Sequence, residues 1–134
     1  MPLATMRACA AGLMAPVEKS VLIVEDEFLI AMDLKLMLEA HGWQVLGPAA
    51  TVRDALAALA AERPSVAFLD VNLGREMVTP VAEKLKESGI PFALGSAYEA
   101  PERYGGADLA GALNVGKPAS DRRILAALAQ LIAD

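Results

Sequence analysis

The feature that most constrains the fold is a regular alternation between short apolar runs and longer amphipathic stretches. The apolar runs predict strands at Val21–Val24, Trp43–Leu46, Ser65–Asp70, Ile90–Leu94 and Ala112–Val115. The stretches between them predict helices at Glu27–His41, Thr51–Arg63, Pro80–Ser88 and Ser120–Ala133. Strands that alternate with helices form βαβ units, so we expect an α/β fold whose doubly wound parallel sheet carries helices on both faces.

Local patterns add detail to these elements. Phe28, Met32 and Leu36 trace one apolar side of the first helix. Gly47–Pro48 should end the second strand, and Asn72–Gly74 should form a loop. The region Tyr98–Leu109 is rich in glycine and weakly patterned, which leaves room for no more than a short helix.

Length and composition narrow the class of protein. The 134 residues suffice for one domain, and 55% of them are hydrophobic, enough for a real core. We expect residues 1–19 to be an N-terminal extension and residues 20–134 to be the domain, with no room for an output domain. The net charge of −5 argues against a nucleic-acid partner, and no apolar run is long enough to span a membrane. A single cysteine cannot form an internal disulfide, so a cytoplasmic location is expected.

Several chemically active residues follow the ends of the predicted strands. Ligands of open parallel sheets bind outside the carboxyl ends of the strands, so these residues should meet. Glu25 and Asp26 follow the first strand, Asp70 ends the third, Ser96 follows the fourth and Lys117 follows the fifth. One acid at a strand end is most simply a solvated turn, but the convergence of several groups indicates a site.

The grouped residue types suit phosphoryl transfer. Carboxylate oxygens are the ligands of a hard divalent cation, here Mg²⁺, which would offset the repulsion among neighbouring acids. Asp70 could accept a phosphoryl group as an acyl phosphate. Lys117 would supply a compact positive charge for a phosphoryl oxygen, and Ser96 would supply a hydroxyl donor.

Four segments resemble the signatures of the receiver domains of bacterial response regulators. They are "VLIVEDE", "VAFLDVNLG", "ALGSAY" and "NVGKP", and the resemblance covers the chain from about Ser20 to Asp134. The resemblance implies a flavodoxin-like (βα)5 sandwich whose five parallel strands have the order 2-1-3-4-5. It also implies two-component signalling, in which such a domain modifies only itself and is not otherwise an enzyme.

The resemblance also implies roles for individual residues. Asp70 matches the phosphoacceptor, Asp26 the direct metal ligand and Glu25 the neighbour that holds metal-bound water. Asn72 matches the residue whose backbone carbonyl completes the metal shell. The remaining two matches are the switch hydroxyl residue, Ser96, and the lysine before proline, Lys117.

A narrower resemblance concerns the fourth strand. "IPFALGSAY" is similar to the Phe-Ala-Thr-Gly-aromatic run of a subgroup of single-domain receivers, some of which act in general stress signalling. Here Gly95, Ser96 and Ala97 stand where that subgroup usually has Ala, Thr and Gly. Asn114 stands where many receivers carry an aromatic switch residue. Tyr98 could serve as the moving aromatic instead, or it could be an ordinary loop tyrosine.

The sequence therefore predicts a single-domain response regulator, monomeric or weakly dimeric. A sensor histidine kinase or a phosphotransfer protein would phosphorylate Asp70, and a downstream protein would read the change or take the phosphoryl group onward. One alternative is a receiver-like binding module that no longer depends on phosphate. Another is a phosphatase or phosphotransferase with an aspartyl nucleophile, although such enzymes generally need a second Asp where this chain has Asn72.

Overall fold

The central element of the molecule is a parallel sheet. The computed structural model describes residues 17–73, 76–95, 113–115 and 120–133. Five strands of the described residues form this sheet in the order β2-β1-β3-β6-β7, and each of them is parallel to its neighbours. The strands are β1 (Val17–Val24), β2 (Gln44–Ala49), β3 (Pro64–Asp70), β6 (Phe92–Gly95) and β7 (Leu113–Asn114). The predicted class and strand order are confirmed.

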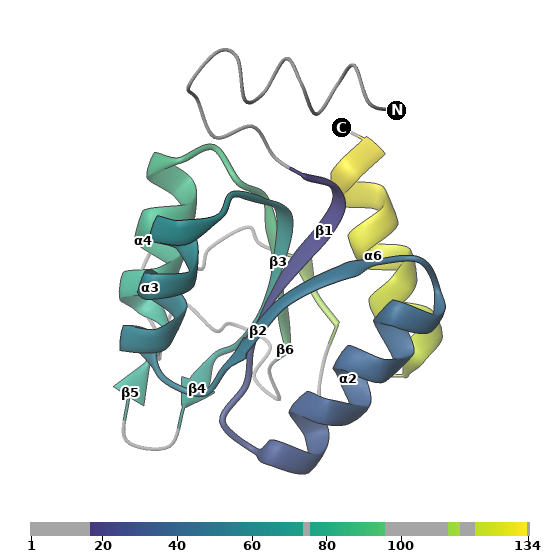
Figure 1. Ribbon diagram of the computed structural model, residues 1–134, viewed down its shortest axis with the longest axis horizontal. Coiled ribbons are helices and arrows are strands. Elements are labelled where there is room, and N and C mark those ends of the chain that lie inside the picture. The colour runs from purple at the N-terminus through teal and green to yellow at the C-terminus, as the bar shows by residue number, and fades with distance from the viewer. Residues whose placement is uncertain (1–16, 74–75, 96–112, 116–119, 134) are drawn as a thin grey trace.

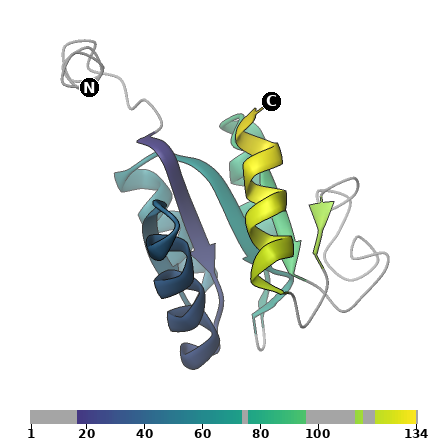
Figure 2. The ribbon, with the colours of Figure 1, turned by 90° about the vertical axis from the view of Figure 1, so that its right-hand side faces the viewer.

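Helices cover both faces of this sheet, as Figure 1 shows. On one face lie α3 (Val52–Ala61) and α4 (Thr79–Glu87), and on the other lie α2 (Phe28–Ala40) and α6 (Asp121–Ala133). Figure 2 shows α2 and α6 side by side on their face. Alternate residues of β1 join opposite cores: Leu22 and Val24 pack on the α3 side, and Val21 and Ile23 pack on the α2 side. Burial on both faces explains why this strand is a continuous apolar run.

Two strands extend by three or more residues beyond their predicted bounds. β1 begins at Val17, four residues earlier than predicted, and its first residue pairs with Pro64. β2 continues through Gly47–Pro48 to Ala49, so the prediction that this dipeptide ends the strand was wrong. The register between β1 and β2 shifts there, from Leu22↔Leu46 to Val24↔Ala49. A proline lacks an N–H group and is tolerated at such an irregularity of an edge strand.

The first helix presents a different face to the core than the sequence suggested. Its buried residues are Ala31, Leu34 and Leu38, whereas Phe28 and Leu36 are 72% and 60% exposed. The side traced by Phe28, Met32 and Leu36 therefore points outward. The helix has apolar residues on both sides, so helical spacing alone could not decide which side faces the sheet.

The segment after β3 contains a short hairpin, so the prediction of a loop was wrong for Asn72 and Leu73, while Gly74 lies outside the described residues. β4 (Asn72–Leu73) and β5 (Glu76–Met77) pair antiparallel, with Asn72 opposite Met77. The hairpin is anchored because Leu73 and Val78 are buried in the core and the Val78 N–H donates to the Val71 carbonyl at 3.2 Å. Burial of these side chains holds β4 and the end of β5 against the core.

Helix boundaries agree closely with the sequence signals. The Thr51 hydroxyl accepts a hydrogen bond from the Asp54 N–H at 3.0 Å and caps α3, and the Ser120 hydroxyl accepts one from the Arg123 N–H at the start of α6. The region Tyr98–Leu109, for which a short helix was considered, lies outside the described residues. Among the described helices none is long and apolar enough to cross a membrane.

Candidate metal centre

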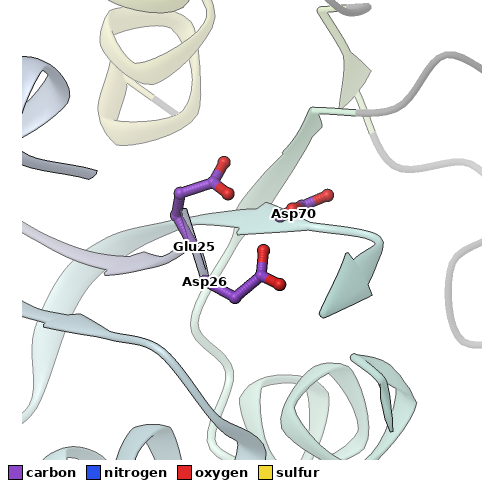
Figure 3. A group of neighbouring side chains, drawn as sticks. All are labelled: Glu25, Asp26 and Asp70. Carbon is purple, nitrogen blue, oxygen red and sulfur yellow. The ribbon is translucent and has the colours of Figure 1, made fainter. Parts of the chain in front are cut away.

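Three carboxylates meet at the carboxyl end of the sheet. One oxygen from each of Glu25, Asp26 and Asp70 lies within 4.8 Å of the oxygens from the other two. Figure 3 shows the three side chains gathered beside the ends of β1 and β3. Glu25 and Asp70 are each only 3% exposed, whereas Asp26 is exposed to solvent. The cluster is thus held by the core on one side and open to solvent at Asp26.

The turn from β1 into α2 orients the first two acids. The Glu25 N–H donates to the Ala49 carbonyl at 2.9 Å, which extends the pairing of β1 with β2 by one residue. The Glu25 carboxylate in turn accepts a hydrogen bond from the Glu27 N–H at 3.2 Å. Glu27 is the residue before the first turn of α2, so Glu25 is tied both to the sheet and to the helix start.

Asp70 is held between two neighbouring strands. The residue before it, Leu69, pairs with Val24 of β1, and Asp70 itself pairs with Gly95 of β6. Val71 follows and is buried on the opposite face of the sheet from Phe68. The backbone of Asp70 is therefore fixed on both sides, and its side chain lies at the edge where β1 and β6 also end.

The electrostatics of this arrangement favour a cation. At the effective dielectric constant of about 20 that suits protein sites, two carboxylates 4.8 Å apart repel by about 3 kcal/mol. Glu25 and Asp70 carry this repulsion while they are buried, although neither side chain is without a partner. A set of carboxylate oxygens from three side chains matches the preference of Mg²⁺ or Ca²⁺ for hard oxygen ligands.

The structure brings together some of the predicted site residues and does not describe others. Glu25, Asp26 and Asp70 meet, and the backbone of Asn72 lies two residues beyond Asp70 in β4. Asn114 is half-buried in β7 and pairs with Leu94. The remaining predicted residues, Ser96, Tyr98 and Lys117, lie outside the described residues.

Two features near the cluster had not been recognised from the sequence. The first is the outward apolar side of α2, which starts two residues after Asp26. The second is the contact of Gly95 with the ring of Phe68, which the pairing of β3 with β6 creates. Helical spacing showed that this side of the helix is apolar but could not show that it faces outward, and the second feature depends on strand register.

Comparison with known proteins identifies the family. Residues 21–129 match the family model described as the response regulator receiver domain. The chain belongs to this family. The receiver domain is 37% identical over 95 residues to the phyllosphere-induced regulator PhyR of Methylorubrum extorquens, covering 69% of this chain but 35% of that protein. The chain thus spans about a third of that relative's length.

Solved structures give the same assignment for the fold. SdrG from Sphingomonas melonis Fr1 is 36% identical to this receiver domain with a TM-score of 0.70, covering 85% of this chain and 96% of SdrG. The anti-anti-sigma factor PhyR from Bartonella quintana is 26% identical with a TM-score of 0.72, covering 99% of this chain and 53% of that one. The fold predicted from the resemblance to receivers is thereby confirmed.

Proposed function

We propose that this receiver domain is a phosphorylation switch in which Asp70 accepts a phosphoryl group with Mg²⁺ bound. The observation that carries the proposal is the convergence of the Glu25, Asp26 and Asp70 carboxylates within 4.8 Å at the carboxyl end of the sheet. Their carboxylates and the Asn72 backbone carbonyl would hold the cation. When bound, Mg²⁺ would neutralise charge on the oxygens of the transferring phosphoryl group.

The proposed reaction makes one bond and breaks one. A carboxylate oxygen of Asp70 attacks the phosphorus atom of a phosphohistidine, the P–N bond breaks, and the imidazole leaves with its electron pair. The product is an acyl phosphate, which water later hydrolyses to inorganic phosphate and the free carboxylate. The domain thus acts only on itself, and it turns over no separate substrate.

Two further residues are assigned to the phosphorylated state. Ser96 follows the last residue of β6, and Lys117 lies three residues after the last residue of β7, so both follow strands at the edge where Asp70 lies. The phosphoryl group would add nearly two negative charges, which would attract the Lys117 ammonium. Its oxygens would also accept a hydrogen bond from the Ser96 hydroxyl. With Asn114 in β7, the readout would rely on Tyr98 or on movement of the strand ends.

The outer side of α2 is the proposed docking surface for the phosphodonor. Phe28, Leu29 and Leu36 are 72%, 76% and 60% exposed, and the helix begins two residues after Asp26. Large apolar side chains grouped on a surface are typical of protein interaction sites. A sensor histidine kinase or phosphotransfer protein seated there would bring its phosphohistidine over Asp70. A cytoplasmic location follows, because kinases of this class take their phosphoryl group from cytoplasmic ATP.

The output of the switch is proposed to be a protein contact. PhyR of Bartonella quintana, 53% of which this chain covers, is described as an anti-anti-sigma factor, a description that indicates regulation through another protein. We propose that phosphorylation of this receiver domain likewise changes its affinity for a downstream protein, or passes the phosphoryl group onward. No nucleic acid is needed for either output.

The test is Mg²⁺-dependent labelling with acetyl phosphate, read by intact mass, on wild type, Asp70→Asn and the control Asp33→Asn. Asp33 is an exposed acid of α2 outside the carboxylate cluster. We expect a phosphate-sized gain in wild type and in the control, with no gain in Asp70→Asn or in EDTA. Absence of labelling, together with no spectral response to Mg²⁺ and beryllofluoride, would instead favour a phosphate-independent binding module.

A further inference from the structure

The aromatic ring of Phe68 lies next to the space that a side chain at position 95 would occupy. A methyl group at position 95 would lie 3.0 Å from Cζ of that ring, closer than carbon atoms normally approach, and 3.5 Å from Cε2, an ordinary contact distance. Gly95 is not among the described glycines with a positive φ, so its backbone conformation suits any residue. The ring of Phe68, not the backbone, is therefore what favours glycine here.

This contact lies directly beneath the carboxylate cluster. Phe68 and Asp70 are two residues apart on β3, so they lie on the same face of the sheet. Asp70 pairs with Gly95 across β3 and β6, while Phe68 pairs with Ala93. The ring must therefore lean along the strand, toward the carboxyl end, to reach Gly95. Phe68 is buried in the core on the α2 and α6 side.

The backbone link between the two strand ends is weak at this point. The Val71 N–H donates to the Gly95 carbonyl over 3.5 Å, at the outer limit for a hydrogen bond. On its other side β6 is held more closely, because the Leu94 carbonyl accepts from the Val115 N–H, just after β7, over 2.9 Å. The Phe68 ring beside Gly95 is therefore a second point at which the ends of β3 and β6 meet.

We propose that Phe68 and Gly95 are a size-matched pair and that Phe68 is a positioning residue for phosphoryl transfer at Asp70. The inference rests on the proposed function and deepens it. The large ring fills the space that the missing Cβ of Gly95 leaves open. The pair fixes where β6 ends beside Asp70.

The pair also gives a physical reason for a departure noted in the sequence. The resembling subgroup usually has alanine where this chain has Gly95. A methyl group could be accommodated only if the buried ring or the strand end moved by a few tenths of an ångström. Interiors are packed too densely for such a shift to remain local, and phosphoryl transfer depends on accurate positioning of the reacting groups.

The experiment compares four variants with wild type: Gly95→Ala, Phe68→Leu, the double variant, and the control Val66→Ala. Val66 lies on the same strand and face as Phe68, two residues further from Asp70. Two quantities are measured for each folded protein, the rate of labelling by acetyl phosphate and the affinity for Mg²⁺ in a thermal-shift titration.

We expect Gly95→Ala to slow labelling about tenfold or more, because it displaces the β6 end next to Asp70. Phe68→Leu removes the ring atoms that meet the added methyl group, so the double variant should label within about threefold of Phe68→Leu alone. Val66→Ala should lower the unfolding temperature while its labelling rate stays close to that of wild type.

Three results would refute the proposal that Phe68 and Gly95 act as a pair. They are normal labelling of Gly95→Ala, a double variant as slow as Gly95→Ala, and slowing by Val66→Ala as large as that by Gly95→Ala. A wild type that no donor labels would overturn the proposed function instead. The proposal about Phe68 and Gly95 would then be tested by the affinity for Mg²⁺, which Gly95→Ala should weaken and the double variant should restore. Unchanged affinity in Gly95→Ala would refute that proposal.

Discussion

Neutralising Asp26 should make the metal-free protein more stable and abolish its response to Mg²⁺. In wild type the Asp26 carboxylate lies within 4.8 Å of both Glu25 and Asp70. Asp26 is exposed, so the dielectric constant of water applies, and each neighbour repels it by about 0.9 kcal/mol at that distance. Glu25 is also adjacent to Asp26 in the unfolded chain, so part of its repulsion persists there and cancels.

The expected gain for Asp26→Asn without metal is therefore about 1–2 kcal/mol in the free energy of unfolding. For a domain of this size that corresponds to a rise of roughly 4–8 °C in Tm. Mg²⁺ at about 100 times its Kd should raise the free energy of unfolding of wild type by about 2.7 kcal/mol, because only the folded state brings the metal ligands together. Asp26→Asn should show almost none of this gain, since one ligand is lost.

Differential scanning fluorimetry in EDTA and in MgCl2 measures both effects. Asp33→Asn serves as the matched control, because it removes the same charge from an exposed position of α2 outside the cluster. It should leave the Mg²⁺ response intact. The reasoning would be refuted if Asp26→Asn lowered the Tm in EDTA, or if it kept the full response of wild type to Mg²⁺.

Three other substitutions test separate parts of the account. Leu29→Gln replaces a side chain that is 76% exposed, so it should leave stability and labelling by acetyl phosphate unchanged. It should slow phosphotransfer from the cognate kinase or phosphotransfer protein, and equal slowing with acetyl phosphate would contradict a docking role. Thr51→Ala removes the hydroxyl that accepts from the Asp54 N–H and should lower the unfolding free energy by about 1 kcal/mol in urea denaturation, with labelling unaffected. Gly47→Ala should cost more than about 1 kcal/mol in the same assay, because Gly47 has a φ of +87° and an added Cβ would lie 2.7 Å from the Ala49 nitrogen; a neutral result would show that the irregular turn in β2 can relax.

Sequence reasoning succeeded where a local pattern determines the structure. The run Val21–Val24 is apolar at every position because both faces of β1 are buried, and this marked the central strand. The acids at the ends of β1 and β3 were expected to meet because the carboxyl ends of neighbouring parallel strands share one edge. Thr51 identified the start of α3 because its side chain can satisfy a free N–H group.

The failures occurred where long-range packing determines the structure. Apolar residues on both sides of α2 made Phe28 and Leu36 look as suitable for the core as Leu34 and Leu38. Gly47–Pro48 resembles a strand terminator, and only the register shift against β1 shows that pairing resumes at Ala49. These features depend on partners that lie far away in the sequence.

The most direct test of the central claim locates the phosphoryl group itself. After Mg²⁺-dependent phosphorylation, borohydride reduces an acyl phosphate of aspartate to homoserine, and peptide mass spectrometry identifies the converted residue. We predict homoserine at position 70, dependent on both donor and Mg²⁺, with Glu25 and Asp26 unchanged. Conversion at Asp26, or incorporated phosphate without any conversion at Asp70, would contradict the assignment of Asp70 as the acceptor.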